Sequence, residues 1–300
     1  MLVAPHPPTA PEVCLLLFIP RLAVCMAILL TAACASKTPL QAEGLATTGK
    51  QYTSTLKKVN GFALAHTLEF TADLLPNLPR DNTTLVQHTE TMQQRAALLH
   101  AAGDYLDTQA LYFAELSALA KGDTSTGTTR ALKKLVEALN KSPDLGGIPR
   151  VQKDALAGLA GHVASWKHGA QVREELQRSA EPVAQALLLN QRILEEQIQW
   201  ITQRETLARQ VEYREKVLKP FVGDKKLGET WKKAWMENIK KPPTIELLEQ
   251  AKAASIDMQQ AWVNVLRGEG SFEHLQGVFD QLNSNIQAAT THEPNTHEPR

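Results

Sequence analysis

Long segments of this chain place apolar residues three and four positions apart. The pattern is clearest in residues 52–74 and 92–121, and this spacing gathers apolar side chains on one face of an α-helix. Pro76 ends the first segment, because proline cannot donate the next helical hydrogen bond. Residues 81–84 (DNTT) then offer side-chain oxygens that can cap the second segment. We therefore predict two helices that pack side by side as an antiparallel hairpin.

The composition favours an all-α fold. Aromatic residues make up only 5% of the 300 residues, and glycine and proline number 16 each, which is low for the turns and aromatic strands of a β-sandwich. Lysine and arginine number 32, as do aspartate and glutamate, so the formal net charge is zero. A nucleic-acid-binding protein usually carries a broad basic surface. We therefore expect no nucleic-acid partner.

The rest of the chain continues the helical periodicity. A short helix is expected between a polar linker at 122–129 and a Pro- and Gly-rich stop at 142–149. We prefer one bundle to two subdomains divided at this linker. Further helices are expected at 151–218, 227–240, 244–267 and 271–289.

The segment 151–218 would reach roughly 100 Å as one helix, at 1.5 Å per residue. Pro182 removes a backbone donor inside it, so we expect a kink or a split near 179–181 and leave its continuity open. Asn190 and Gln197 fill alternate core positions, which favours packing within one chain over a dimeric zipper. The segment also carries apolar residues at heptad spacing, namely Leu187, Leu194, Ile201 and Ala208.

Residues 13–34 form an apolar stretch that Pro20 and Arg21 interrupt. Arg21 fits the positive region of a signal peptide, residues 22–30 its apolar region, and residues 31–33 the small residues before a cleavage point. The run after Arg21 is too short to cross a bilayer, which takes about 20 apolar residues. The stretch therefore predicts export of the protein.

The run LLTAAC, residues 29–34, resembles the lipobox of bacterial lipoproteins. The resemblance implies that residues 1–33 are removed and that Cys34 is acylated, which anchors the protein in a membrane. Since Ala35 is not aspartate, it also implies sorting to the periplasmic face of the outer membrane. The run departs from the family pattern at Thr31, where leucine is favoured. An ordinary signal peptide or an uncleaved anchor is the alternative.

These observations divide the chain into four parts. Residues 1–33 form the signal peptide, and a start further downstream is an added hypothesis because residues 1–20 contain no lysine or arginine. Residues 34–49 are small and polar, so we predict a flexible tether. Residues 50–290 form the bundle, which we predict to be elongated and antiparallel, with long, partly coiled-coil-like helices. Residues 291–300 repeat THEP and are expected to be disordered.

The cysteines all lie near the N-terminus, at Cys14, Cys25 and Cys34. A body without cysteine forms no internal disulfide, and it offers neither a thiol nucleophile nor a thiolate metal ligand. We therefore expect helix packing alone to stabilise the body.

Motifs of enzyme chemistry are weak in this sequence. The string GLATTGKQ, residues 44–51, is close to a phosphate-binding loop, but Gln51 replaces the Ser or Thr that binds magnesium and the string lies in the expected tether. No histidine stands at a metal-binding spacing. His66, with Glu69 one turn later, is the most interesting histidine and gives a third, fainter hypothesis of a helical enzyme, but we expect a core or boundary histidine there. We predict no enzyme, no catalytic residue, no cofactor and no metal site.

One region carries a charge signature. Residues 214–241 contain nine basic and four acidic side chains. Trp231 and Trp235 lie one helical turn apart, beside Lys232 and Lys233, a pattern compatible with docking on anionic headgroups or on an acidic partner. In the alternative, the tryptophans pin a short helix to the bundle and the lysines reach into water.

Taken together, these features predict a non-enzymatic envelope lipoprotein that acts as a helical scaffold or adaptor for an envelope protein partner. The alternative is a helical bundle that binds an apolar ligand in the periplasm, close to Trp166 or Trp200.

Overall fold

The computed structural model of the protein describes residues 37–141, 156, 159, 169–240, 243–270 and 272–291. All the regular elements in these ranges are helices, which confirms the all-α prediction. The α-helices are α3 (Lys37–Leu74), α4 (Asn82–Ala120), α5 (Thr126–Asn140), α8 (Ala170–Glu212), α9 (Lys219–Gly223), α10 (Glu229–Ile239), α11 (Pro243–Leu266) and α12 (Glu273–Thr291). A 3₁₀ turn, η1 (Leu75–Asn77), follows α3, and a π-helix, η3 (Tyr213–Leu218), joins α8 to α9.

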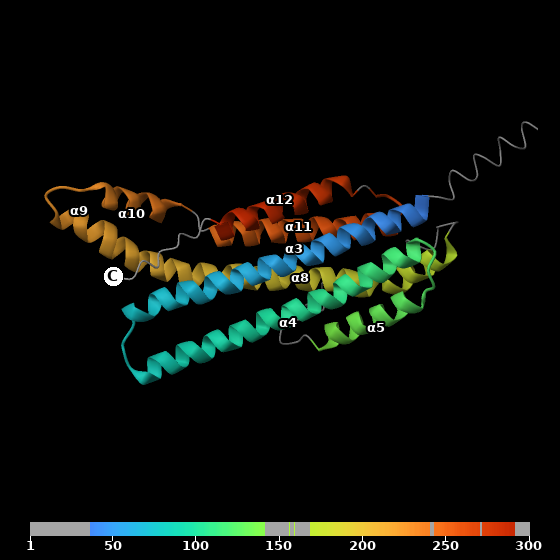
Figure 1. The fold of residues 1–300 in the computed structure, drawn as a ribbon, viewed down its shortest axis with the longest axis horizontal. Helices are drawn as coiled ribbons and strands as arrows, with labels where there is room; N and C mark the ends of the chain where they lie inside the picture. Colours follow the sequence, from blue (N-terminus) through green and yellow to red (C-terminus); the bar gives the residue numbers. More distant parts are fainter. Residues whose placement is uncertain are drawn as a thin grey trace, which may run out of the picture.

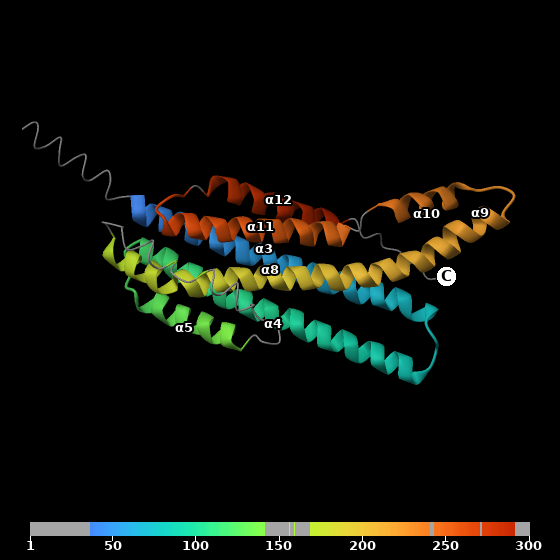
Figure 2. The same cartoon turned by 180° about the vertical axis from the view of Figure 1, so that it is seen from behind.

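The long helices lie side by side along one axis, so the body is an elongated bundle (Figures 1 and 2). Helix α3 packs on α4, α8, α11 and α12, and α5 packs on α4 and α8. Helices α3 and α4 run antiparallel, as do α8 and α11 and then α11 and α12 (Figure 1). The predicted antiparallel bundle is confirmed. None of the described helices is both long enough and apolar enough to cross a membrane.

The local signals at the first helix pair behave as expected. Helix α3 ends at Leu74, and Pro76 lies in the 3₁₀ turn that follows. The side chain of Asp81 caps α4 by accepting the backbone N–H of Thr84 at 2.8 Å. The apolar stripe of α3, which includes Tyr52 and Val59, is buried in the bundle core. The sequence-based hairpin of two helices is therefore confirmed.

The predicted flexible tether at 34–49 is wrong from residue 37 onward, because α3 begins there rather than near residue 50. Leu45 and the small residues Ala42, Ala46 and Thr48 are fully buried. A Cβ added at Gly49 would lie 2.5 Å from the ring of Phe113 on α4. Small residues in this stretch allow close helix contact, and the glycines of the string 44–51 belong to a helix interface instead of a tether or a phosphate-binding loop.

Pro182 does not split α8, which runs unbroken from Ala170 to Glu212. The sequence left the continuity of this segment open, with a kink or a split expected near 179–181, and the structure shows no split there. The indole Nε1 of the fully buried Trp262 on α11 donates to the carbonyl oxygen of Ala180 at 2.9 Å, so packing from a neighbouring helix supports this stretch. Most of 151–168 lies outside the described residues.

The heptad positions of α8 face the interior of the chain's own bundle. Leu187, Leu194 and Ile201 are buried in the common core, which confirms the preference for packing within one chain. Asn190 is also buried, and its Nδ2 donates to Gln109 Oε1 at 2.9 Å while Gln109 Nε2 donates to Asn190 Oδ1 at 3.1 Å. Such a reciprocal amide pair fixes how α4 and α8 are aligned.

The same buried layer extends to two more helices. Asn190 Nδ2 also donates to the hydroxyl oxygen of Tyr52 on α3, at 2.9 Å. That hydroxyl shares a 2.6 Å hydrogen bond with Ser255 on α11. We call Tyr52, Gln109, Asn190 and Ser255 the polar layer, which joins four helices in one alignment.

Several predicted boundaries shift by a few residues. The linker at 122–129 is shorter than expected, because α5 begins at Thr126. The helices expected at 227–240, 244–267 and 271–289 correspond to α10, α11 and α12. The signal peptide 1–33 and the tail 292–300 lie outside the described residues.

Candidate functional site

A helical hairpin formed by residues 213–240 extends from one end of the bundle. Its first arm is η3 with α9, which prolongs α8, and its second arm is α10, which returns to α11 (Figures 1 and 2). The arms pack on each other, η3 against α10. Helix α3 begins at Lys37 at the opposite end of the molecule (Figure 1). The predicted site residues Trp231, Lys232, Lys233 and Trp235 all lie on α10.

Trp231 holds the two arms together. Its indole Nε1 donates to the carbonyl oxygen of Val217 on η3 at 3.0 Å. Its ring stacks between Phe221 and Trp235, with ring centroids 5.8 and 6.3 Å away. The alternative that the tryptophans pin α10 to the bundle does not hold for the Trp231 hydrogen bond, which joins α10 to η3, the other arm of the hairpin.

Arg209 on α8 closes the base of the hairpin. Its Nη1 donates to the carbonyl oxygen of Lys240 at 2.6 Å and to that of Asn238 at 3.2 Å. Asn238 Nδ2 donates to the carbonyl oxygen of Arg209 at 3.3 Å. A guanidinium at a helix C-terminus satisfies unpaired carbonyls and suits the negative end of the helix dipole. The end of α10 is thus held against the end of α8.

Both arms of the hairpin leave large apolar side chains in solvent. Val222 is 79% exposed and Phe221 60% exposed on the first arm, and Ile239 is 65% exposed on the second. Trp235 is 44% exposed, so one of the two predicted tryptophans does reach the surface. Clustered exposed apolar residues on a folded protein mark an interaction surface. Leu218, Leu227 and Met236 are further exposed apolar residues of the hairpin.

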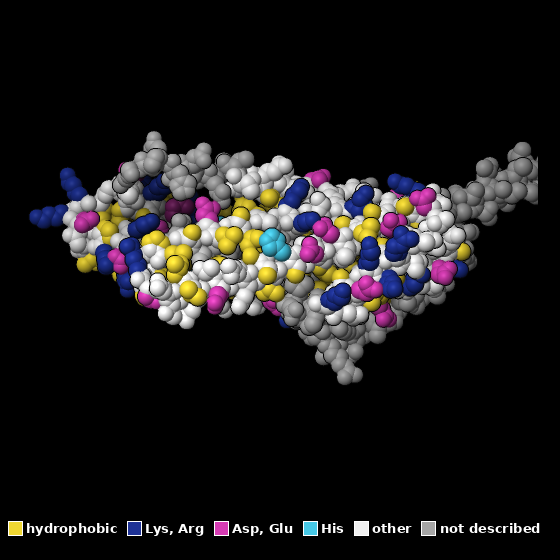
Figure 3. Space-filling view, turned by 60° about the horizontal axis from the view of Figure 1, so that its bottom comes forward, with side chains coloured by type: hydrophobic (Ala, Val, Ile, Leu, Met, Phe, Trp, Pro, Cys, Tyr) yellow, Lys and Arg dark blue, Asp and Glu magenta, His cyan; other side chains and the backbone are white. Residues whose placement is uncertain are grey.

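Basic side chains surround these apolar residues. Lys232 and Lys233 are exposed, and Lys232 Nζ lies 3.8 Å from the exposed carboxylate of Glu229. Lys225 and Lys226 are exposed in the loop between the arms. At this end of the molecule Figure 3 shows apolar side chains interspersed with lysine and arginine. The hairpin is therefore an amphipathic, basic surface.

Sequence reasoning found the second arm of this site but missed the first. The apolar pair Phe221 and Val222 lies between Pro220 and Gly223 in a lysine-rich stretch, and that juxtaposition is the signal that points to it. Cys34, the predicted lipidation site, lies outside the described residues.

A second constellation surrounds His66 and includes a carboxylate from another helix. His66 Nε2 lies 3.9 Å from Oε1 of Glu205 on α8, whose side chain is almost fully buried. Burial raises the pKa of Glu205 to about 7, against the opposing effect of Arg209. His66 and Phe62 line a cavity of about 530 Å³ between α3, α11 and α12. This carboxyl group can exchange a proton near neutral pH.

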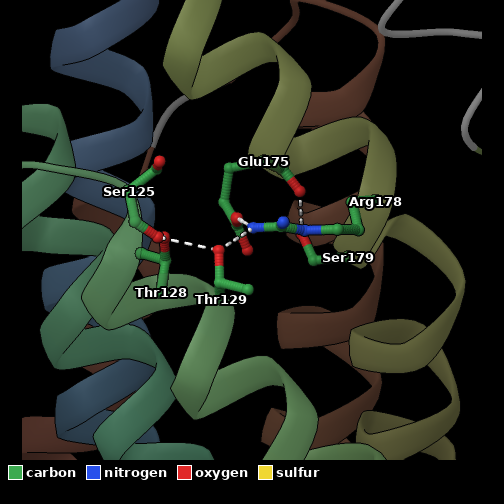
Figure 4. A network of polar contacts seen from close by, with 6 residues as sticks. All are labelled: Ser125, Thr128, Thr129, Glu175, Arg178 and Ser179. Atoms are coloured by element: carbon green, nitrogen blue, oxygen red, sulfur yellow. Dashed lines mark hydrogen bonds and ion pairs between the residues drawn. The ribbon is translucent and has the colours of Figure 1, made fainter.

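A polar network around the buried Glu175 links α5 to α8 (Figure 4). Glu175 is fully buried and pairs with Arg178, one turn later on α8. Arg178 Nη2 also donates to Thr129 Oγ1 on α5 at 2.8 Å. Burial raises the pKa of Glu175, while the hydrogen bond from Arg178 opposes the rise. Because its partners belong to two packed helices, we assign this network to the stability of the bundle.

Trp200 on α8 is one of the two tryptophans near which the alternative ligand site is expected. Its ring lies beneath two guanidinium groups, with Arg95 at 5.1 Å and Arg204 at 4.8 Å from the centroid. Cation–π contacts of this kind stabilise a surface aromatic ring. Trp166 lies outside the described residues.

Within the described ranges, no three His, Cys, Asp or Glu side chains come close enough together to hold a metal ion. The described part of the chain is an elongated all-α bundle from which one hairpin projects, and this hairpin exposes both basic and apolar side chains. Comparison with protein-family models, with curated proteins and with solved structures finds no match for this chain.

Proposed function

We propose that the protein is a non-enzymatic envelope lipoprotein that acts as a helical scaffold or adaptor. In this proposal the acyl chains on Cys34 anchor it to the periplasmic face of the outer membrane. The bundle then holds the hairpin, and the envelope partner that we predict for it, at a distance from that membrane. The observation that carries the proposal is the position of the hairpin at the end of the molecule opposite to the start of α3 (Figure 1).

The bundle is suited to the role of a spacer. Residues 170–223 follow one helical path of about 80 Å, at about 1.5 Å per residue. The polar layer and the surrounding core fix the alignment of α3, α4, α8 and α11. Only two residues, 35 and 36, separate Cys34 from the first described helix, so the proposed anchor lies close in sequence to the start of the rod.

Mass measurement and fractionation in the native host test the anchor. We expect the membrane-extracted protein to have the mass of residues 34–300 plus diacylglycerol, with or without a further acyl chain. Cys34→Ala abolishes retention in the membrane pellet after high-salt and carbonate washes, whereas Cys25→Ala, the matched control in the same segment, leaves it unchanged. An unmodified mass, or a Cys34→Ala protein still in the washed pellet, contradicts the proposal.

A second candidate, the apolar-ligand-binding bundle, is favoured by one observation. A cavity of about 540 Å³ lies between α11 and α12, with Ala254, Val278 and Leu282 in its wall. Cavities of this size between bundle helices accommodate small ligands. This function predicts that a lipid extract changes the tryptophan fluorescence and raises the thermal midpoint of the protein, and no response to the extract counts against it.

A further inference from the structure

The outer end of the hairpin combines protruding apolar side chains with lysines. Val222, the most exposed large apolar residue described, ends the first arm next to Phe221. Lys225 and Lys226 follow in the loop, and both are exposed. We call these four residues the tip.

The second arm repeats this combination. Trp235 and Ile239 are exposed on α10, where Lys232 and Lys233 are exposed as well. Tryptophan prefers the boundary between headgroups and acyl chains. Lysine side chains extend their apolar stems along an apolar surface and place the ammonium group among anionic headgroups. Both arms therefore offer the side-chain chemistry of an interfacial membrane contact.

The shape of the hairpin favours a lipid bilayer over a protein as its partner. Phe221 and Val222 protrude at the outer end of the first arm, next to the loop, whereas Ile239 lies at the end of α10, near the base that Arg209 closes. The cavities described above, in contrast, lie on the bundle, between α3, α11 and α12. A protein partner gains most of its affinity where anchor side chains fill well-packed pockets, whereas a bilayer accepts single protruding side chains.

Charge is divided between the hairpin region and the rest of the chain. Residues 214–241 carry nine basic and four acidic side chains, a surplus of five, in a chain whose formal net charge is zero. The rest of the sequence therefore carries a surplus of five negative charges. An anionic surface attracts the hairpin and repels the remainder, so the molecule meets such a surface with the tip first.

We propose that the tip inserts into the headgroup region of a second, anionic bilayer, so that the protein anchored through Cys34 bridges two membrane surfaces. The bridge rests on the proposed function, because the acyl anchor supplies the first membrane. The helical path of α8, η3 and α9, about 80 Å long, sets the scale of the separation.

Vesicle tethering tests the bridge with the protein as it exists. The full acylated protein is extracted from its host membrane and reconstituted into phosphatidylcholine vesicles. These are mixed with a second population made of phosphatidylcholine alone or with phosphatidylglycerol, and tethering is followed by fluorescence cross-correlation. We expect tethering only to the vesicles that contain phosphatidylglycerol, and we expect high salt to abolish it.

Two variants separate charge from apolar insertion. Lys225→Glu/Lys226→Glu should reduce tethering about tenfold or more, since each basic residue near an anionic surface contributes about 1 kcal/mol. Lys133→Glu/Lys134→Glu on α5 is its matched control, because that exposed pair lies on the bundle. Val222→Ser should also weaken tethering.

Val86→Ser on α4 is the control for Val222→Ser, since Val86 is also exposed but lies outside the hairpin. Neither control should alter tethering. Far-ultraviolet circular dichroism checks that every variant keeps the helical fold.

The outcomes distinguish the two proposals. An unmodified mass overturns the anchor and, with it, the bridge. Acylated protein that fails to tether anionic vesicles overturns the bridge alone, as does unchanged tethering by Lys225→Glu/Lys226→Glu. A crosslink from the tip to an acidic envelope protein, without vesicle tethering, assigns the hairpin to a protein partner and also overturns the bridge.

Discussion

Gly49 lies where α3 contacts α4, and its replacement by alanine tests the close packing of this part of the chain. The added Cβ would lie 2.5 Å from two ring carbons of Phe113. That ring is almost completely buried and has no room in solvent to move into. Gly61, on the same helix, provides the matched control, because no atom lies within 4 Å of a Cβ added there.

The two substitutions should have opposite signs. Alanine is preferred to glycine in a helix by about 1 kcal/mol, so Gly61→Ala should raise the free energy of unfolding by about that amount. Gly49→Ala gains the same amount from the helix propensity of alanine, but it overpacks the core, which costs about 1–3 kcal/mol. The net effect at Gly49 is a loss of up to about 2 kcal/mol.

Urea unfolding followed by circular dichroism measures both changes. We expect the midpoint of Gly61→Ala to lie above that of the wild type and the midpoint of Gly49→Ala below it, with similar dependence on urea concentration. Equal increases for both variants would refute the close contact with Phe113, whereas no change in Gly49→Ala would restore the interpretation of residues 34–49 as a tether.

Three more predictions follow from the interior and the hairpin. Asn190→Leu removes the partner of the buried Gln109 amide and should lower the unfolding free energy by about 1–3 kcal/mol in a urea titration; a smaller loss in Asn190→Leu/Gln109→Leu would show that the unpaired amide is the cause. Because the pKa of Glu205 rises to about 7 on folding, the folded state binds its proton more tightly, so stability should fall as the pH rises from about 4.5 to 7. Glu205→Gln should flatten that part of the pH profile of the thermal midpoint, and an unchanged profile would contradict the assignment. Trp231→Ala removes the pin between the arms, so amide hydrogen exchange should accelerate in the hairpin and stay slow in the bundle, whereas protection throughout would argue against the pin.

Local patterns predicted the bundle well, because its first elements depend on short-range chemistry. The cap at Asp81 and the stop at Pro76 act within one helical turn. The stripe that includes Tyr52 needs only helical periodicity to be recognised. The local sequence predicts these features correctly because packing between the helices favours the same helix ends and the same buried face.

The errors arise where the answer depends on a distant part of the chain. A stretch of small residues around Gly49 is equally compatible with a solvated tether and with close helix contact, and only Phe113 decides between them. The carboxylate of Glu205 beside His66 comes from another helix, so local spacing could not point to it. Likewise, the sequence left the continuity of α8 through Pro182 open, because it depends on contacts with other helices such as that of Trp262 with Ala180.

Because Arg209 closes its base, the whole hairpin can be exchanged as one module. Since Arg209 Nη1 lies 2.6 Å from the carbonyl oxygen of Lys240, the chain leaves the rod and re-enters it at neighbouring points. Insertions and replacements are tolerated best where the two ends of the exchanged segment lie close together at a surface. Evolution or engineering can therefore swap residues 213–239 for a short loop or another recognition element and retain the same spacer.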